Sequence, residues 1–148
     1  MRFKNRYLLF ELAYADDKYV DESLHAGIIA AIIRDSVQLN FGDYGIGILG
    51  GAIAIKYFSP HTGIGILRAP RDHYQLAWAA LTLVTQVKKK SAMLRVLHLG
   101  GTIKQCQLVT IEYDQAKLRT LKRAKILDDT RAEELRHKNA ADINSMLP

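Results

Sequence analysis

The chain has 148 residues, 49% hydrophobic and 24% charged, so it is long enough to bury one ordinary core and too apolar to be disordered. A net charge of +6 favours polyanionic partners such as nucleic acid, although a basic surface without a dedicated ligand gives the same count. The single cysteine excludes an intrachain disulfide, and no apolar run is long enough for a signal peptide or membrane span. We therefore expect a soluble protein of a reducing compartment.

The first predicted element is a β-strand over Arg6–Tyr14. Aromatic and aliphatic side chains alternate along it with a period of two, which is typical of a half-buried strand. One face is expected to carry Leu8, Phe10 and Leu12. The other is expected to carry Tyr7, Leu9 and Glu11.

A long helix is predicted next, from about Glu22 to Asn40. Asp21 is its expected N-cap, because the carboxylate can accept the free amide protons of the first turn. Gly42 is the expected stop, since glycine enters the left-handed region at little cost. Apolar residues recur at helical spacing between these ends, namely Leu24, Ile28, Ile29, Ile32, Ile33, Val37 and Leu39.

Gly45–Gly50 matches the G-x-G-x-x-G pattern of dinucleotide sites. That pattern binds a pyrophosphate only where it follows a strand and opens a helix, so that free amides face the phosphates. Here it follows the predicted helix and precedes a predicted strand. We interpret it as a flexible glycine-rich connection and reject a nucleotide site.

Ala52–Ser59 and Ile64–Arg68 are predicted to form a β-hairpin, because the intervening residues, Pro60 to Gly63, are typical of a turn. Strand alternation predicts that one face of the first strand carries Ile53, Ile55 and Tyr57, with Lys56 on the other.

A second helix is predicted over about Arg71–Val87, with Pro70 at its first position. Lys88-Lys89-Lys90 is expected to close it as a solvated helix end, where cations interact favourably with the helix dipole. A specific RNA contact by these lysines is the less favoured alternative.

Two β-prone stretches, Leu94–Leu99 and Ile103–Tyr113, surround Gly100-Gly101, and at least one of them is expected to be a strand. From Asp114 onward the composition is helical and mixed in charge. The resulting order, β-α-β-β-α-β, predicts an α+β, RRM-like or ferredoxin-like sandwich over residues 1–113, with a helical extension and a frayed end over 114–148. In that fold two helices cover one face of an antiparallel sheet. The other face is expected to be free for RNA or another protein.

No arrangement of residues indicates an enzyme or a metal site. The five histidines are scattered, and adjacent carboxylates lie in polar stretches where solvation explains them. Cys106 has no indicated base and is expected in the core. The RNP1 signature that stacks RNA bases on RRM sheets is not found, so Tyr57 and Phe58 are expected to pack in the core or an interface.

The basic start of the chain is a candidate RNA contact. Arg2, Lys4 and Arg6 alternate, so an extended arm would direct all three cations to the same side, where they could follow a phosphate backbone. A solvated leader before the first strand fits the same residues equally well.

Several separated segments also resemble one known family. The segments are Arg2–Leu12, Asn40–Gly45, Ile55–Ser59, Thr62–Ile64, Leu67-Arg68, His98–Lys104 and Cys106-Gln107. In this order, over Arg2 to Tyr113, they resemble the small RRM-like (Pop-five family) protein subunit of ribonuclease P, which in eukaryotes also belongs to ribonuclease MRP. The segment Asn40–Gly45 is closest to fungal versions.

The resemblance implies a noncatalytic subunit of a ribonucleoprotein endoribonuclease. In that family the RNA cleaves the 5′ leader of precursor tRNA with RNA-bound Mg ions, the MRP form acts on ribosomal RNA precursors, and the protein binds no cofactor. The subunit braces the catalytic domain of the RNA and pairs with a TIM-barrel-like subunit of about thirty kilodaltons and a second small RRM-like subunit. The implied location is the nucleus and nucleolus, without a membrane.

Basic and glycine positions inside the matching segments are the predicted RNA-binding residues. They are Arg2, Lys4, Asn5, Arg6, Arg68, Gly100, Gly101, Thr102 and Lys104. Arg68 is the weaker candidate because it could pair with a carboxylate within the fold, and the two glycines are expected to permit a tight turn. A protein-interaction module with an incidental basic surface remains the alternative function. A small enzyme would need a pocket of converging polar groups.

Overall fold

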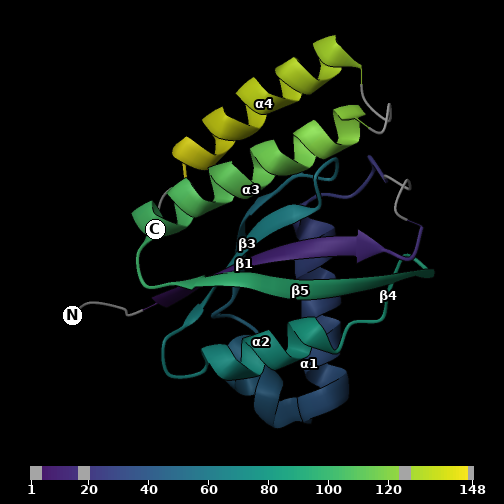
Figure 1. The fold of residues 1–148 in the computed structure, drawn as a ribbon. Helices are drawn as coiled ribbons and strands as arrows, with labels where there is room; N and C mark the ends of the chain where they lie inside the picture. Colours follow the sequence, from purple (N-terminus) through teal and green to yellow (C-terminus); the bar gives the residue numbers. More distant parts are fainter. Residues whose placement is uncertain (1–4, 17–20, 124–127, 147–148) are drawn as a thin grey trace.

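The computed structural model describes residues 5–16, 21–123 and 128–146 (Figure 1). In chain order the elements are β1 (Asn5–Tyr14), α1 (Ala26–Leu49), β2 (Ala54–Phe58), β3 (Ile64–Pro70), α2 (Tyr74–Thr82), β4 (Gln86–Val87), β5 (Lys90–Gly100), α3 (Ile103–Arg123) and α4 (Asp129–Asn144). Within the described part, no helix has the length and apolar character needed to cross a membrane.

The strands form one antiparallel sheet in the order β2-β3-β1-β5-β4. Strand β1 is central: Leu8 lies opposite Leu67 of β3 on one side and opposite Leu99 of β5 on the other. This is the split β-α-β arrangement, in which helix crossovers place the first strand between two later ones. The α+β sandwich predicted from the sequence is confirmed.

Helices α1 and α2 cover one face of the sheet. The fully buried residues Phe10, Ile29, Ile33 and Leu81 are part of this larger core. Burial of such a side chain contributes roughly 1.5–3 kcal/mol, so the alternation of β1 is strongly specified. The predicted faces of β1 are confirmed, since Leu8, Phe10 and Leu12 lie in this core, while Tyr7 and Leu9 lie in a second one.

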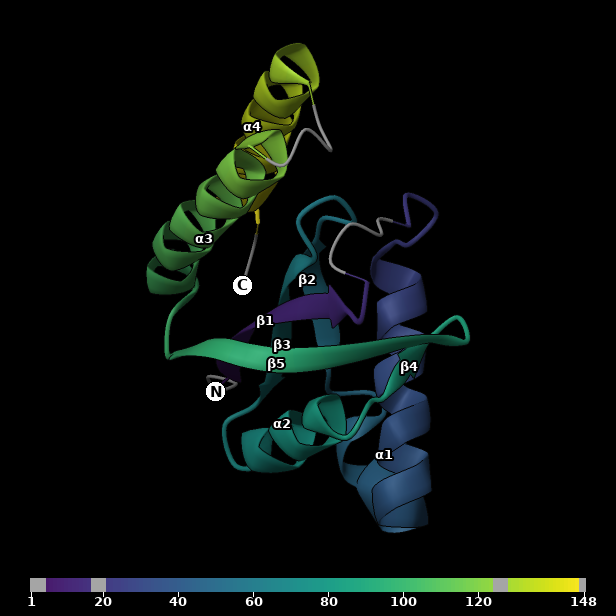
Figure 2. The same cartoon turned by 45° about the vertical axis from the view of Figure 1, so that its right-hand side comes forward.

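Helices α3 and α4 form a second layer on the opposite face of the sheet (Figures 1 and 2). Cys106, on α3, packs with Leu9 of β1 and Ile66 of β3, and Ile143 of α4 belongs to the same cluster. The prediction of a free sheet face is therefore wrong. The margin at β5 stays open, where the Met93 side chain is 49% exposed.

Of the two β-prone stretches, residues 94–99 lie in β5, which confirms the expectation of at least one strand, whereas residues 103–113 are helical. Their buried positions recur every four residues, at Cys106, Thr110 and Asp114, as on one face of a helix. Two of these three side chains are polar, and this hides the helical stripe from a search for apolar periodicity. Residue 113 lies inside α3, and the predicted division of the chain at this point stays a prediction.

Helix α1 starts and ends differently from the sequence prediction. His25 is its N-cap, with Nδ1 accepting a hydrogen bond from the Gly27 amide at 3.1 Å, whereas the Asp21 carboxylate accepts from the Ser23 amide in the preceding turn. The predicted stop, Gly42, is a kink with φ 64° and ψ −157°, after which the helix continues to Leu49. The flexible glycine-rich connection is therefore wrong: Gly45 is buried, and its missing Cβ would lie 2.6 Å from Phe41 Cβ.

A β-bulge changes the faces of β2. Ile55 lies opposite Leu67, whereas Tyr57 lies opposite Ile66, so Lys56 is the extra residue between the two pairs. Ile55 packs toward α1, and Tyr57 packs in the α3-side cluster. The prediction that these two side chains share a face is wrong for this reason.

The second helix is shorter than predicted, because α2 ends at Thr82 and residues 86–87 form the short strand β4. Val87 pairs with Lys90, which leaves Lys88 and Lys89 as a two-residue turn with φ values of 51° and 67°. The lysines therefore form a β-hairpin turn and not a helix end. Two left-handed lysines are unusual at positions where Asn and Gly are favoured, and sequence propensity does not reveal such a turn.

Candidate nucleic-acid interface

Three strand ends meet at one end of the sheet. Tyr7, near the start of β1, lies opposite Arg68 near the end of β3 and opposite Gly100 at the end of β5. Asn5 and Arg6 extend β1 one step further, opposite Pro70 and Ala69. The register therefore brings predicted residues from three separate segments of the sequence to the same end of the sheet.

Helix α3 begins at this end of the sheet. Thr102 precedes it, and its Oγ1 accepts a hydrogen bond from the Gln105 amide at 3.3 Å, which satisfies one free donor of the first turn. Lys104 is exposed in that turn, and no acidic residue accompanies it. A helix N-terminus carries partial positive charge, so Lys104 adds to a potential that favours phosphate.

Gly100 and Gly101 are not required by the backbone conformation. The chain passes from β5 to α3 over residues 101–102, so the connection is short, but among the described glycines positive φ values occur only at Gly42 and Gly63. A Cβ at Gly100 would make an ordinary 3.6 Å contact with Cys106, and one at Gly101 would meet no atom within 4 Å. Gly101 thus presents bare, exposed backbone to any ligand that approaches the start of α3.

Arg6 and Arg68 lie on different faces of the sheet. Alternation places Arg6 on the side of Leu8, toward α1 and α2, and its Nη1 donates to the Asn5 carbonyl at 3.1 Å. Arg68 lies on the side of Tyr7, toward α3, and its buried Nε has no hydrogen-bond partner among the described residues. Burial raises the pKa of Tyr7, and the positive charge of Arg68 opposes that shift. No carboxylate pairs with Arg68 within the described chain, contrary to the alternative raised from the sequence.

The predicted site is therefore only partly gathered. Arg6, Arg68, the segment 100–102 and Lys104 lie at one end of the sheet, but the two arginines leave it on opposite faces. Arg2 and Lys4 lie outside the described residues. Their assignment, like that of the whole set, stays a prediction.

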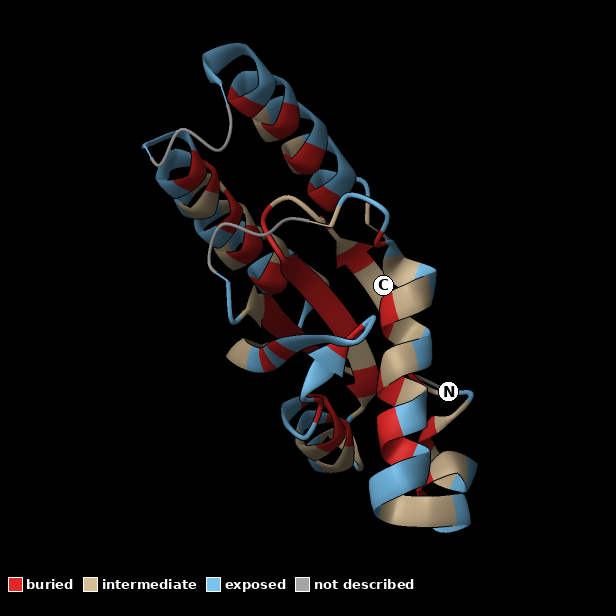
Figure 3. Ribbon diagram, turned by 90° about the vertical axis from the view of Figure 1, so that its right-hand side faces the viewer, coloured by how far each residue is buried: buried red, intermediate tan, exposed pale blue. Residues whose placement is uncertain are grey.

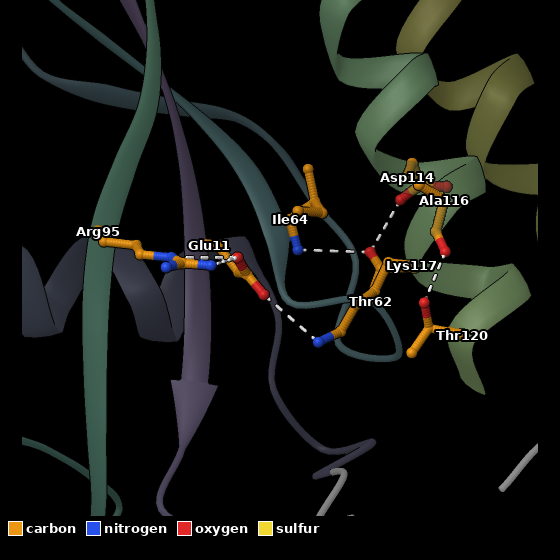
Figure 4. Close-up of polar contacts among 8 residues, drawn as sticks. All are labelled: Glu11, Thr62, Ile64, Arg95, Asp114, Ala116, Lys117 and Thr120. Carbon is orange, nitrogen blue, oxygen red and sulfur yellow. Dashed lines mark hydrogen bonds and ion pairs between the residues drawn. The ribbon is translucent and has the colours of Figure 1, made fainter. Parts of the chain in front are cut away.

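A buried polar network fixes the second helical layer to the sheet. The Asp114 carboxylate of α3 accepts hydrogen bonds from Thr62 Oγ1 at 2.8 Å, Tyr57 Oη at 3.1 Å and Asn139 Nδ2 at 3.1 Å (Figure 4 shows the Thr62 bond). Desolvation raises the pKa of Asp114, and the three donors oppose that shift. The network joins β2, the β2–β3 turn, α3 and α4. It fixes the middle of α3 against the β2–β3 turn.

An ionic cluster makes a second connection between α3 and the sheet. Glu11 of β1 accepts from Arg95 Nη2 at 2.9 Å and from Lys117 Nζ at 3.3 Å, with the carboxylate buried between the two cations (Figure 4). Sequence reasoning found neither this cluster nor the Asp114 network, because their members lie far apart along the chain. The same reasoning placed Cys106 in the core, and this is confirmed: the thiol is buried, and burial raises its pKa.

The fold and this surface define an RRM-like α+β protein with a basic end of the sheet. Comparisons with known proteins support this assignment. The model of the Rpp14/Pop5 family matches residues 6–111. The ribonuclease P/MRP protein subunit POP5 of Schizosaccharomyces pombe is 41% identical over 129 residues, covering 82% of this chain and 93% of that protein.

Further comparisons point the same way. The human ribonuclease P/MRP protein subunit POP5 is 35% identical over 122 residues, covering 80% of this chain and 74% of that protein. A chain in the cryo-EM structure of yeast ribonuclease MRP has the same fold, with a TM-score of 0.56 at 8% identity over 78% of this chain and 95% of that chain. This chain belongs to the Rpp14/Pop5 family, which confirms the resemblance read from the sequence.

Proposed function

We propose that this protein is the POP5-type subunit of ribonuclease P and ribonuclease MRP, a noncatalytic RNA-binding component of a ribonucleoprotein endoribonuclease. The observation that supports this most strongly is the 41% identity to the fission-yeast subunit, which extends over 93% of that protein. The RNA of the particle carries catalysis with its own Mg ions, in 5′-leader removal from precursor tRNA and in ribosomal RNA processing. The particle works in the nucleus and nucleolus.

The proposed role of this chain is to brace the catalytic domain of the RNA. Three features of the structure support it: the basic strand ends around Arg6 and Arg68, the cationic first turn of α3 with Lys104, and the bare backbone at Gly101. Phosphate contacts of this kind position a protein on RNA without reading its sequence. The open β5 margin and the exposed helical surfaces leave room for the TIM-barrel-like and the second RRM-like subunits.

Affinity purification of the tagged chain at moderate salt, followed by sequencing of the retained RNA, tests the proposal. We expect a ribonuclease P or MRP RNA to be recovered, together with precursor-tRNA cleavage that RNase treatment of the particle abolishes. Recovery of protein partners without either RNA would instead favour a protein-interaction module. Cleavage that survives RNase treatment would contradict RNA catalysis.

A further inference from the structure

Positive charge is concentrated in one segment that lies outside the family match. Residues 115–127 contain five cations, Lys117, Arg119, Lys122, Arg123 and Lys125, and no acidic residue, in a chain whose net charge is +6. The family model ends at residue 111, so this segment lies beyond the residues that the model matches. Lys125 lies outside the described residues, and the other four cations occupy the C-terminal half of α3.

Packing against α4 determines which of these side chains face solvent. Leu118 and Leu121 of α3 are buried, as are Ala132 and Leu135 of α4, where the two helices meet. Figure 3 shows the buried stripes of both helices and their exposed outer surfaces. Arg119 and Arg123, one helical turn apart, are both exposed on α3.

A hollow of about 250 Å³ lies between the two helices. Arg119, Lys122 and Gln115 of α3 line it, together with Arg136 and Glu133 of α4. Glu133 accepts two hydrogen bonds from Arg136, each at 3.1 Å, and Lys122 lies 3.5 Å from the exposed Asp129 carboxylate. Arg119 lines the hollow but forms no ion pair or hydrogen bond with any described residue. Arg123, one turn further along α3, also has no such partner among the described residues.

Helices α3 and α4 differ in how their charged side chains are paired. On α4, Arg131 pairs with Glu134 and Arg136 pairs with Glu133, each three residues apart. On α3, Arg119 has Lys122 and Arg123 at the equivalent neighbouring positions, where like charges repel and destabilise a helix. The helix dipole favours cations in the last turn, which accounts for Lys122 and Arg123 but not for Arg119 one turn earlier. A polyanion would relieve this repulsion.

We propose that the groove between α3 and α4 binds the phosphate backbone of RNA through Arg119, Lys122 and Arg123. This inference rests on the proposed function, because that function supplies RNA as the polyanion. A protein partner fits less well, because protein interfaces use exposed aromatic and aliphatic anchors. The large exposed hydrophobic side chains of the described chain all lie before residue 114. At 1.5 Å per residue along α3, the groove is a second contact roughly 20–30 Å from the sheet end, in the C-terminal half of the helix.

The test measures the affinity of the full-length chain for a short RNA hairpin as a function of salt. Arg119→Gln with Arg123→Gln removes two cations while keeping good helix formers, so the circular dichroism spectrum should stay unchanged and the thermal midpoint should not fall. The matched control, Lys89→Gln with Lys138→Gln, removes two exposed cations elsewhere. We expect the groove variant to bind several-fold more weakly, with a salt slope reduced by about two units, and the control to keep the wild-type slope.

The remaining outcomes separate the inference from the proposed function. If the wild type binds the hairpin and both variants lose the same affinity, the cations act only through net charge and the groove assignment is overturned, while RNA binding by the chain stands. If the wild type binds no RNA, both are overturned. If acidic peptide displaces the hairpin at equal charge concentration, the groove is a site for acidic protein and the RNA assignment fails.

Discussion

Asp114 has an unusual environment for a carboxylate, because three neutral donors and no cation surround it among the described residues. Asp114→Ala would leave the buried donors of Tyr57, Thr62 and Asn139 without their acceptor, and each such loss is costly. We expect the free energy of unfolding in urea to fall by about 3 kcal/mol. The control Thr120→Ala removes an exposed bond to the Ala116 carbonyl and should cost less than about 0.5 kcal/mol (Figure 4). Equal effects of the two changes would contradict the role of the network.

Asp114 should also make stability depend on pH. Burial raises its pKa above the ordinary value of 3.8, so the folded state holds the proton more tightly than the unfolded state does. This contribution is complete below pH 3.8 and is lost as the pH rises through the folded pKa. Urea titrations of wild type and Asp114→Asn should therefore show the wild type losing stability relative to the variant from about pH 4 upward. A pH-independent difference would exclude a raised pKa.

A substitution at Gly101 tests RNA contact without disturbing the fold. A Cβ there meets no atom within 4 Å and the backbone is not left-handed, so Gly101→Ala should keep the free energy of unfolding within about 0.5 kcal/mol. The same methyl group would obstruct RNA that approaches the start of α3, and we expect several-fold weaker RNA binding in a filter assay. Gly47→Ala, equally open but on α1, is the control and should bind as the wild type does. Unchanged binding by Gly101→Ala would place the RNA elsewhere.

Among the elements, the β4–β5 hairpin has the clearest local strain. Lys88 and Lys89 both have positive φ, which costs a residue other than glycine or asparagine about 1 kcal/mol. Lys88 donates to Ser23 Oγ at 2.6 Å and lies 3.9 Å from Asp21, so it gains contacts at this position. No such contact holds Lys89 among the described residues.

Lys89→Gly should therefore stabilise the protein by about 0.5–1 kcal/mol, because glycine adopts the left-handed conformation without strain. Lys90→Gly is the matched control and should be destabilising, since residue 90 is extended in β5 and glycine weakens a strand. Thermal and urea unfolding measure both changes. A loss of stability in Lys89→Gly would show that its side chain makes a stabilising contact.

Helix α3 shows what the pattern of a single element can and cannot predict. Its buried face combines Cys106, Thr110 and Asp114 with Leu118, and the polar members are buried only because partners on distant elements satisfy them. Those partners are invisible in the local sequence, so β-branched residues such as Ile103 and Ile111 suggested a strand. The excess of positive charge over residues 115–127 is the local signal that points to the C-terminal half of α3.

For the whole molecule, the order of the first five elements and the two faces of β1 followed from hydrophobic periodicity, because the burial of large side chains dominates there. The second helical layer did not follow, since it depends on contacts between residues such as Ser59 and Asn139, which are 80 positions apart. Only some residues of the predicted site lie close together. Strand register places Arg68 and Gly100 opposite Tyr7, whereas strand alternation puts Arg6 and Arg68 on different faces of the sheet.

Photo-crosslinking in the native particle tests the central claim most directly. The tagged chain is purified with its RNA, irradiated and digested, and RNA-linked peptides are mapped by mass spectrometry. We predict crosslinks at residues 5–6 and 100–104, where three strand ends and the start of α3 form the basic end of the sheet. Crosslinks confined to α1 and α2 would contradict the account, because they would place the RNA away from the strand ends and the start of α3.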